Sequence, residues 1–431
     1  MREMKDSGTP WIGQIPSTWS LIRFKDKYQS IKEVAREKSV EFERLALTLN
    51  GVIKRPKDDS EGLQPKEFDT YQILRENDFV FKMIDLQNIS TSRVGLSPYT
   101  GLVSPAYIRF TPKNESQYNK FVYYYLMSLY YNCVYNNLGG NGVRSALNAT
   151  DMGEFIVPYP DEETQKRVCA FLDSQCSKVD LLISNVEAQI EKFKAYKQSL
   201  ITEIVTKGLN PDVQMKDSGV DWIGEIPEQW STLRVKYIGE TQNGISKGGE
   251  FFGSGYPFVS YGDVYKNIEL PKIASGLVQS TEAEREAYSV QKGDIFFTRT
   301  SETIEEVGFS SVCMETIEDA TFAGFLIRLR PFNDALTPEY AKYYFRGEHI
   351  RKYLVKEMNL VTRASLGQGL LKAMTVLIPP HDEQLEIASY LDEKCIGIDK
   401  LISIKQDKIA KLEQYKKSLI YEYVTGKKEV I

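Results

Sequence analysis

Cysteine and histidine are scarce in this chain of 431 residues, which has five Cys and two His. Neither CxxC spacing nor a neighbouring histidine accompanies the cysteines, which are Cys133, Cys169, Cys176, Cys313 and Cys395. The sequence therefore predicts neither a disulfide framework nor a zinc site, and this usage is typical of a reducing cytoplasm. His349 and His381 stand in different regions without metal-ligating partners, so we expect both at the surface.

Long apolar runs and an excess of one charge are also missing. No run approaches the roughly 20 residues that a membrane-spanning helix needs, and MREMKDSGTP lacks the apolar stretch of a signal peptide. We therefore expect a cytoplasmic protein without a membrane partner. The 54 basic and 59 acidic residues give a formal net charge of −5, which excludes a histone-like polycation but not a local basic surface.

Motifs of nucleotide and nucleic-acid chemistry are not found. GxxxxGK[ST] and GxGxxG do not occur, so ATP hydrolysis and dinucleotide binding have no basis in the sequence. Neither Pro-Asp dipeptide is followed by the acid-x-Lys triplet of a metal-dependent nuclease. The only Pro-Pro, Pro379-Pro380, lacks the residues with which an adenine methyltransferase would hold a flipped base, and it is typical of a helix start. We therefore expect no catalytic residue, metal or cofactor in this chain.

What the chain does contain is a duplication. MKDSGTPWIGQIPSTWS (residues 4–20) returns as MKDSGVDWIGEIPEQWS (residues 215–231), and these two segments hold all four Trp residues. A second pair includes FLDSQCSKVDLLIS (residues 171–184) and YLDEKCIGIDKLIS (residues 390–403). The offsets are 211 and 219, so the second middle region carries a net insertion of 219 − 211 = 8 residues. The expected organisation is a variable domain at 1–160, a helix and linker at 161–213, a variable domain at 214–378 and a helix at 379–431.

Apolar residues recur at three- and four-residue steps in both helical segments, which predicts amphipathic helices with a narrow seam. Such helices more often pair with a similar helix than pack on a sheet. We therefore expect an antiparallel coiled coil between two pseudo-two-fold-related domains, with Tyr196 and Tyr415 within the seam. The candidates for the helix pair or a subunit interface are Leu182, Ile190, Phe193, Leu200, Leu401, Ile409, Leu412 and Leu419.

The helices could act as a spacer. About 28 helical residues give ~40 Å of rod, which is close to the ~34 Å between the half-sites of a dimeric DNA reader. The alternative is that the helices serve only dimerisation or a core.

Each middle region combines strand-like and helix-like stretches. DIFFT and GFLIRLRP are typical of strands, and PEYAKYYFRGEHIRKYL is typical of a helix, so each domain is predicted to be mixed α/β. NDFVFK (residues 77–82) and GDIFFT (residues 293–298) are weak echoes of each other. They suggest one fold that carries two different surfaces.

Basic residues interleaved with tyrosines crowd residues 342–363, which is the pattern of a phosphate-facing element. Lys342 and Lys356 belong to this stretch, and loops that follow strands offer further candidates. The candidate DNA-binding residues are Lys82, Arg93, Arg144, Arg299, Arg346, Arg351, Lys352 and Arg363. Each of them could instead be a solvated surface charge.

Over essentially its whole length the sequence resembles the DNA-specificity subunits of type I restriction-modification systems. The resembling motifs are SGTPWIGQIPSTW and SGVDWIGEIPEQW, which open the halves, and VPYPDEETQKRVCAFLD and LIPPHDEQLEIASYLD, which open the helices. The first helix motif departs from the usual Pro-Pro-x-x-Glu-Gln pattern, because it has Tyr159-Pro160 and Thr164-Gln165.

The resemblance implies a non-catalytic subunit with two target-recognition domains, each reading one half of a split, asymmetric site in double-stranded DNA. It also implies that the helices fix the gap and dock two methyltransferase subunits, and that motor-nuclease restriction subunits complete the enzyme. S-adenosylmethionine, ATP and Mg²⁺ would then belong to the partner subunits.

Two other readings remain open. The chain could be a stand-alone nuclease or methyltransferase of unrecognised type, which activity of the purified chain with Mg²⁺ or S-adenosylmethionine would reveal. It could also be a coiled-coil scaffold that does not bind DNA, which the acidic balance favours. A lack of DNA affinity at any salt concentration in the assembled complex would support the scaffold.

Overall fold

The computed structural model describes residues 2–49, 51–59, 67–84, 86, 93–138, 146–301, 307–357 and 364–430. It divides into two compact units, one made of Met1–Val186 and Asp407–Ile431 and the other of Glu187–Gln406. The predicted boundaries set the domains apart from the helices. In the structure, each unit joins one domain to a part of both long helices, and the predicted boundaries stay a prediction.

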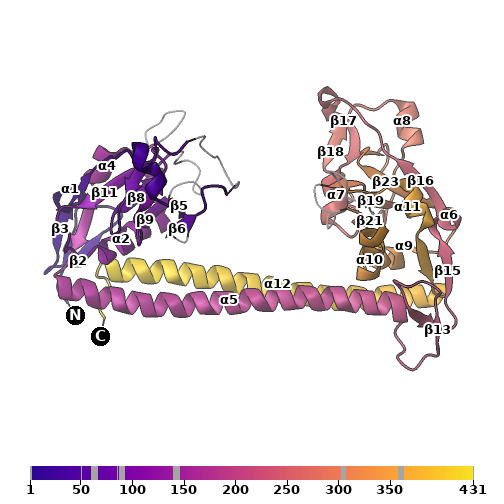
Figure 1. Cartoon of the computed structure of the whole chain (residues 1–431). Helices are drawn as coiled ribbons and strands as arrows, with labels where there is room; N and C mark the ends of the chain where they lie inside the picture. The colour runs from indigo at the N-terminus through magenta and orange to yellow at the C-terminus, as the bar shows by residue number, and fades with distance from the viewer. Residues whose placement is uncertain are drawn as a thin grey trace. The chain divides into compact units, whose positions relative to one another are not determined.

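The first unit is built on two four-stranded sheets and two short strand pairs (Figure 1). One sheet has the order β4–β11–β8–β9 and the other β6–β5–β10–β7, while β1 pairs with β2 and β3 with β12. The strands are β1 Met4–Asp6, β2 Gln14–Pro16, β3 Ser20–Arg23, β4 Tyr28–Ser30, β5 Arg44–Thr48, β6 Gly51–Arg55, β7 Gln72–Leu74, β8 Phe79–Lys82, β9 Arg93–Leu96, β10 Gly101–Val103, β11 Ile108–Pro112 and β12 Ile156–Tyr159. The short helices are α1 Phe24–Lys27, α2 Lys120–Tyr131, α3 Val134–Leu138 and α4 Ala149–Gly153.

The second unit has a four-stranded sheet of order β16–β23–β19–β21 and a three-stranded sheet of order β18–β17–β22, with three further strand pairs. The strands are β13 Met215–Asp217, β14 Glu225–Pro227, β15 Ser231–Arg234, β16 Gly239–Asn243, β17 Phe252–Val259, β18 Gly276–Val278, β19 Ile295–Thr298, β20 Thr300–Ser301, β21 Ser310–Val312, β22 Thr321–Phe322, β23 Leu326–Pro331, β24 Ala364–Ser365 and β25 Thr375–Ile378. The short helices are α6 Val235–Ile238, α7 Tyr261–Lys266, α8 Glu282–Ala287, α9 Pro338–Tyr344, α10 Glu348–Glu357 and α11 Gln368–Ala373.

The two domains share one sheet and differ in the other. In the shared sheet β8 and β19 pair antiparallel with β11 and β23, and this confirms the match between the NDFVFK and GDIFFT segments. The other sheet is four-stranded in the first unit and three-stranded in the second, where β17 runs for eight residues. The predicted mixed α/β class and the duplication are confirmed.

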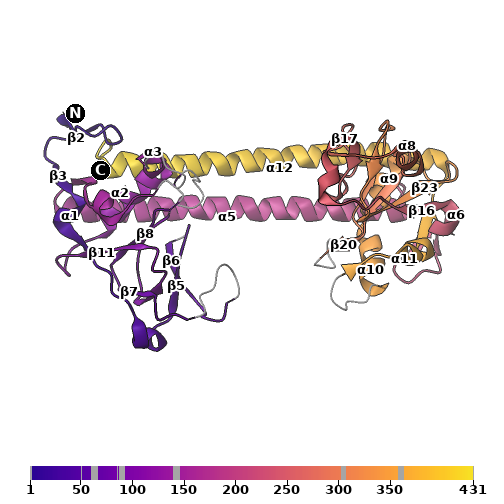
Figure 2. The same cartoon turned by 90° about the horizontal axis from the view of Figure 1, so that it is seen from above.

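Two long helices cross the division between the units: α5 spans Glu162–Lys207 and α12 spans His381–Val424. Asp161 caps α5, because its carboxylate accepts the main-chain N–H of Thr164 at 2.9 Å. Inside the second unit, Lys197 of α5 contacts Asp399 of α12. Gln189, which lies earlier in α5, contacts Lys405, which lies later in α12. This order confirms the predicted antiparallel pairing (Figure 2).

The seam between the helices follows alternating steps of four and three residues, the heptad pattern of a coiled coil. Its buried or half-buried positions are Val179, Ile183, Val186, Ile190, Phe193, Lys197 and Leu200 in α5 and Ile398, Ile402, Lys405, Ile409, Leu412, Lys416 and Leu419 in α12. Six of the eight predicted interface residues belong to it, and their role at a subunit interface stays a prediction.

Four residues expected in the seam lie outside it: Leu182 and Leu401 are 46% and 44% exposed, and Tyr196 and Tyr415 are 58% and 54% exposed. Their place in the seam is taken by the neighbours Ile183, Ile402, Lys197 and Lys416. A lysine can line a seam because its aliphatic stem packs there while its ammonium reaches a carboxylate at the edge.

Each domain is attached to a long helix by a repeated carboxylate. The phenolic hydroxyl of Tyr124 in α2 donates to Asp173 in α5 at 2.7 Å, and Tyr343 in α9 donates to Asp392 in α12 at 2.6 Å. The cores also take in helix residues, since Leu419 packs in the core of the first domain and Leu200 in that of the second.

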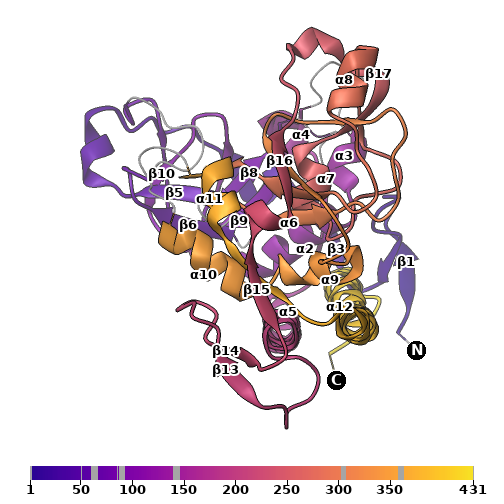
Figure 3. The same cartoon turned by 90° about the vertical axis from the view of Figure 1, so that its right-hand side faces the viewer.

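The repeated Trp motif closes the end of the helix in the second unit. Figure 3 shows β13 and β14 beside the end of α5, where Gly208 has a φ of 78°. A Cβ atom on Gly208 would lie 2.9 Å from Glu383 and 3.3 Å from the ring of Trp230, so this left-handed close approach requires glycine. Trp230 is fully buried and its Nε1 donates to Glu383 at 2.9 Å.

Candidate nucleic-acid interface

The same backbone junction recurs at the end of the central strand in each domain. In the first unit, Met83 follows β8, and its carbonyl accepts the main-chain N–H of Leu147 at 3.2 Å. In the second unit, Arg299 follows β19, and its carbonyl accepts the N–H of Leu366 at 2.7 Å. We call these regions the strand-end junctions: residues 82–84 with 146–147, and residues 298–301 with 364–366. Each joins a strand end to the segment that follows the predicted arginine, Arg144 or Arg363.

Five of the predicted DNA-binding residues belong to the sequence around these junctions, namely Lys82, Arg93, Arg144, Arg299 and Arg363. Lys82 is half-buried at the end of β8, and its register partner in β9 is Arg93, whose side chain lies outside the described residues. Arg299 is half-buried in the second junction. Arg144 lies outside the described residues, two positions before Ala146, which forms a bridge with Ile84.

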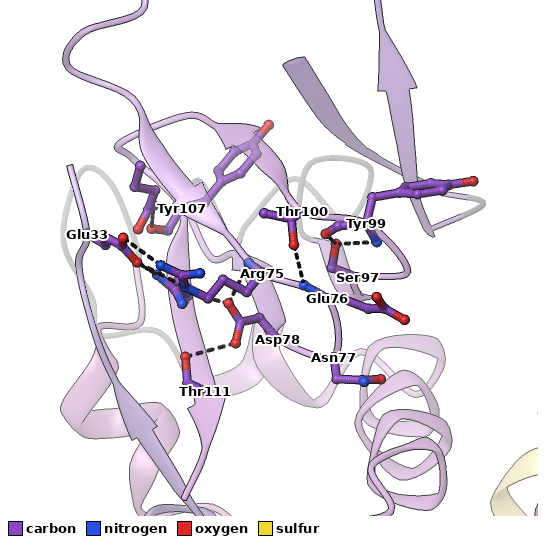
Figure 4. A network of polar contacts seen from close by, with 12 residues as sticks. Glu33, Arg75, Glu76, Asn77, Asp78, Ser97, Tyr99, Thr100, Tyr107 and Thr111 are labelled. Atoms are coloured by element: carbon purple, nitrogen blue, oxygen red, sulfur yellow. Dashed lines mark hydrogen bonds and ion pairs between the residues drawn. The ribbon is translucent and has the colours of Figure 1, made fainter. Parts of the chain in front are cut away.

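A buried carboxylate fixes the start of the central strand (Figure 4). Asp78 accepts the main-chain N–H of Arg75 at 2.7 Å, the Nε–H of Arg109 at 2.5 Å and the hydroxyl of Thr111 at 2.8 Å. Burial raises the pKa of Asp78, and the N–H of Arg75 and the guanidinium of Arg109 oppose that rise. Glu33 completes the network through Arg75 at 2.8 Å.

The second domain repeats this anchor with different partners. Asp294 precedes β19 and accepts the N–H of Gln291 at 2.8 Å and two N–H groups of Arg330 at 2.7 and 2.6 Å. The side chains of Asp78 and Asp294 are each 1% exposed. Both carboxylates therefore position the strands that lead to the junctions and do not present charge to a ligand. The sequence analysis did not predict this role, although the two aspartates stand at matching positions of the repeated segments, in NDF and in GDI.

The basic stretch of the second domain separates into solvent-facing and internal residues. Lys352 is exposed on α10, and Lys356 on the same helix lies 3.8 Å from Asp221. Arg351 is half-buried and donates to the carbonyl of Val307 at 2.5 Å. Arg363 lies outside the described residues. Lys352 and Arg351 therefore remain DNA-binding candidates, and both lie on α10, the helix that precedes the second strand-end junction.

Arg346 has a different environment from the one the pattern predicted. Its guanidinium donates to the carbonyl oxygens of Ser310 at 2.6 Å, Val264 at 2.9 Å and Asn267 at 2.8 Å. Burial lowers the pKa of Arg346 to about 10. These bonds hold α7 and β21 against the chain after α9, an arrangement that does not favour a contact with phosphate.

Lys342, from the same basic stretch, is also internal. It is 5% exposed and forms ion pairs with Glu269 at 2.7 Å and Asp392 at 2.6 Å. A phosphate-facing role is therefore wrong for this residue, because reaching DNA would leave two carboxylates without their partner.

The expectation that both histidines lie at the surface is wrong for His349. It is 3% exposed, stacked on Trp222 with ring centroids 6.2 Å apart, and 4.7 Å from the ring of Tyr344. Burial, aided by the charge of Lys352, lowers the pKa of His349 to about 3, so the ring is neutral at ordinary pH. His381 is exposed as expected.

Two searches of the described residues bear on other functions. They contain no cluster of three or more His, Cys, Asp or Glu side chains placed to hold a metal ion. Among the same residues, no helix has the length and apolarity that crossing a bilayer requires.

Two copies of one mixed α/β domain, with the same central sheet, different outer strands and a shared pair of long helices, define a protein built by internal duplication. Residues 30–192 and 227–414 match the model of the type I restriction modification DNA specificity domain. This chain therefore belongs to that family. Specificity subunits are non-catalytic components of type I restriction-modification enzymes.

Individual relatives agree with the family match. The MjaVIII specificity subunit of Methanocaldococcus jannaschii is 23% identical over 356 residues, which cover 82% of this chain and 80% of the relative. The EcoKI specificity subunit of Escherichia coli is 23% identical over 287 residues, 63% of this chain and 57% of the relative. A solved chain from a study of complex assembly and conformational transition of a type I system shares the fold, with a TM-score of 0.66, 15% identity and coverage of 95% of this chain and 98% of that chain.

Proposed function

We propose that each domain of this specificity subunit reads one half of a bipartite, asymmetric DNA site. The observation that carries the proposal is the combination of a shared central sheet with different outer strands. A duplicated protein that bound the same half-site twice would have no need of different surfaces at equivalent positions. Specific reading of bases requires side chains placed at groove edges, and these can differ while the scaffold stays constant.

The strand-end junctions are the elements that we propose to face DNA. Lys82 and Arg299 stand there on strands anchored by Asp78 and Asp294, and Lys352 lies on the helix before the second junction. Lysine and arginine at such positions would contact phosphates or guanine edges in the major groove. Arg93, Arg144, Arg351 and Arg363 remain candidates for the same role.

The helix pair offers a docking surface for methyltransferase subunits. In the second unit, the register set by the ion pair of Lys197 with Asp399 brings Tyr196 level with Leu401. In the first unit, the ion pair of Lys416 with Asp180 sets the same register and brings Leu182 level with Tyr415. Because the helices are antiparallel, equivalent heptad positions lie on the same side of the seam. Each unit thus exposes one leucine and one tyrosine together, which is an apolar surface suited to a protein partner.

In this proposal the paired helices also set the gap between the half-sites. Two methyltransferase subunits and the motor-nuclease restriction subunits would supply the chemistry, using S-adenosylmethionine, ATP and Mg²⁺. This chain would determine only the site on double-stranded DNA at which the complex acts.

Modification mapping in cells tests the proposal. The chain is expressed with its methyltransferase subunit, and methyladenine positions are read by single-molecule sequencing. The second domain, residues 214–378, is then exchanged for that of another family member. We expect a split motif in which the exchange changes one half only. A change in both halves would contradict separate reading, and an assembled complex without DNA affinity would support the scaffold alternative.

A further inference from the structure

A tight turn leads into the strand beside the central strand in both domains. In the second unit, β23 pairs with β19 so that Leu326 lies opposite Thr298, at the strand-end junction. The main-chain N–H of Leu326 donates to the carbonyl of Ala323 at 2.9 Å. In the first unit, the N–H of Tyr107 donates to the carbonyl of Ser104 at 3.1 Å. Each bond joins the fourth residue of a turn to the first, which is the pattern of a β-turn.

The strand register shows that these two turns are equivalent. Ile108 of β11 pairs with Phe81 of β8. Ile327 of β23 pairs with Phe297 of β19 in the same way. The two phenylalanines are matching positions of the NDFVFK and GDIFFT segments. The four residues that precede each isoleucine, SPAY in the first domain and AGFL in the second, therefore correspond to each other.

The third residue of this turn is exposed in both domains but differs between them. It is Ala106 in the first domain and Phe325 in the second, where it is 65% exposed. The carbonyl of Phe325 accepts the main-chain N–H of Arg299 at 2.9 Å, and the N–H of Gly324 donates to the carbonyl of Ile245 at 2.8 Å. A single exposed apolar residue is common on protein surfaces. What distinguishes Phe325 is its place on a hydrogen-bonded turn that both domains share.

Phe325 stands beside an available positive charge. Arg299 is half-buried, and its guanidinium forms no hydrogen bond or ion pair with the part of the chain that the structure describes. Such a group is free to contact a phosphate or a guanine edge. Neighbouring strands lie ~5 Å apart, and a main-chain hydrogen bond joins the two residues directly. A duplex that Arg299 contacts is therefore within reach of the Phe325 ring.

The chemistry of a phenyl ring limits what it can read in DNA. It has no N–H or O–H to donate and no carbonyl to accept, and the major-groove edge of a base pair carries a single apolar group, the C5-methyl of thymine. Aromatic wedges that unstack base pairs act from the minor groove, whereas in the proposed function the junction faces the major groove. Contact with a thymine methyl is the use that fits this position.

We propose that Phe325 is a specificity-determining residue of the second domain and that it contacts the C5-methyl group of a thymine in the second half-site. Ala106 is too short for the same contact, so the first domain would not read thymine from its equivalent turn. The inference rests on the proposed function, because it takes the strand-end junction as the surface that faces DNA.

Exchange of thymine for uracil in the target tests the contact, because deoxyuridine lacks only the methyl group. The methylated motif is mapped first, and the exchange of residues 214–378 identifies the half-site of the second domain. Deoxyuridine then replaces each thymine of that half-site in turn. Fluorescence anisotropy measures how tightly each duplex binds the complex of this chain with its methyltransferase subunit.

The parent chain is compared with F325A and with the matched control F332A. Phe332 is also 65% exposed, but it follows the opposite end of β23, which is Leu326–Pro331, and so lies ~20 Å from Phe325. Both rings are exposed, so neither substitution should disturb folding. Thermal unfolding of both variants checks this.

We expect one of these exchanges to lower the affinity of the parent complex roughly fourfold, the effect of one buried methyl group. F325A should bind the thymine and uracil duplexes equally at that position, and F332A should discriminate as the parent does. Uracil in the first half-site should have the same effect in all three complexes.

Four outcomes would overturn the inference: a second half-site without thymine, a parent complex that does not respond to uracil at any thymine there, discrimination retained in F325A, or discrimination lost in F332A. A loss of affinity in F325A without any response of the parent to uracil would point to insertion between base pairs instead. Failure of the proposed function looks different, because the parent complex would then bind its mapped site no more tightly than unrelated DNA.

Discussion

Lys416 and Asp180 form an ion pair between the long helices, with the ammonium 2.6 Å from one carboxylate oxygen and 2.7 Å from the other. The duplication repeats it 219 residues apart as Lys197 and Asp399, also at 2.6 Å. Asp180 and Asp399 are 55% and 56% exposed, so each pair should contribute only about 0.5 kcal/mol. A double-mutant cycle with D180A and K416A in denaturant unfolding measures the coupling. A coupling above ~2 kcal/mol would show that water does not reach the pair.

Seam and surface residues of the helices should respond differently to substitution. Leu419 and Leu200 are 5% and 9% exposed within the domain cores, so L419A and L200A should each cost about 2–5 kcal/mol of unfolding free energy. L200D and L419D together should disrupt the helix pair and abolish methyltransferase docking. Size-exclusion chromatography with the partner measures assembly, and assembly at normal affinity would contradict the role of the helices.

The exposed tyrosines provide the complementary test of docking. Y196E and Y415E alter side chains that are 58% and 54% exposed, so the unfolding free energy should change by no more than about 0.5 kcal/mol. Affinity for the methyltransferase subunit should fall roughly tenfold or more, because charge enters an apolar interface. Isothermal titration calorimetry measures it, with E191Q on the same helix as the control. Unchanged affinity in both tyrosine variants would place docking elsewhere.

The acid sensitivity of the second domain should depend on His349. Its folded pKa of about 3 lies below the ordinary value near 6.5, so between these values the unfolded chain binds the extra proton. Stability is therefore complete above pH 6.5 and falls by about 1.4 kcal/mol per pH unit as the pH drops toward 3. H349F should be more stable and less acid-sensitive, because Trp222 and Tyr344 surround the ring with aromatic surface.

Thermal unfolding at pH 7.5 and pH 5 measures this effect, and His381 supplies the control because its side chain is 58% exposed. H381Q should leave the difference between the two pH values unchanged. Equal acid sensitivity in H349F and the parent chain would mean that His349 is protonated in the folded state.

Much of the fold could be predicted because the duplication can be recognised directly from repeated segments of the sequence. The Trp motifs and the 219-residue offset identify two copies, and three- and four-residue steps identify the helices. The phase of the seam was harder. Tyr196 is the more apolar neighbour of Lys197, yet the lysine lines the seam because Asp399 receives its ammonium at 2.6 Å. Periodicity alone does not contain that partner, which lies 202 residues away.

The candidate site was less predictable because neighbouring charges of one stretch meet different long-range partners. Arg346 meets the carbonyls of Val264 and Ser310, whereas Lys352 faces solvent. The same limit applies to Ala106 and Phe325. Only the strand register shows that they occupy equivalent turns, because SPAY and AGFL share no residue at matching positions.

The spacer role of the helices predicts how the DNA target changes with helix length. Inserting one heptad into each helix, after Gln189 and after Gln406, preserves the phase of the seam and adds about 10 Å. At ~3.4 Å per base pair the unspecified gap should grow by about three base pairs, while the bases read on either side stay the same. Methyladenine mapping measures both. An altered half-site would show that spacing and reading are not separable.

Substitutions of Lys352 and Arg346 should have different effects on DNA binding and stability if DNA binds at the second junction. K352A removes an exposed charge, so it should weaken binding of the complex evenly across sequences and reduce the salt slope of log affinity by about one.

R346A leaves several carbonyls of the 264–267 and 310 segments without donors, so it should cost roughly 2–4 kcal/mol of stability. Its salt slope should stay unchanged where the domain remains folded. Fluorescence anisotropy between 50 and 200 mM salt and thermal unfolding distinguish the two. A reduced slope in a folded R346A complex would return Arg346 to the DNA surface, because an internal guanidinium releases no counterions from DNA.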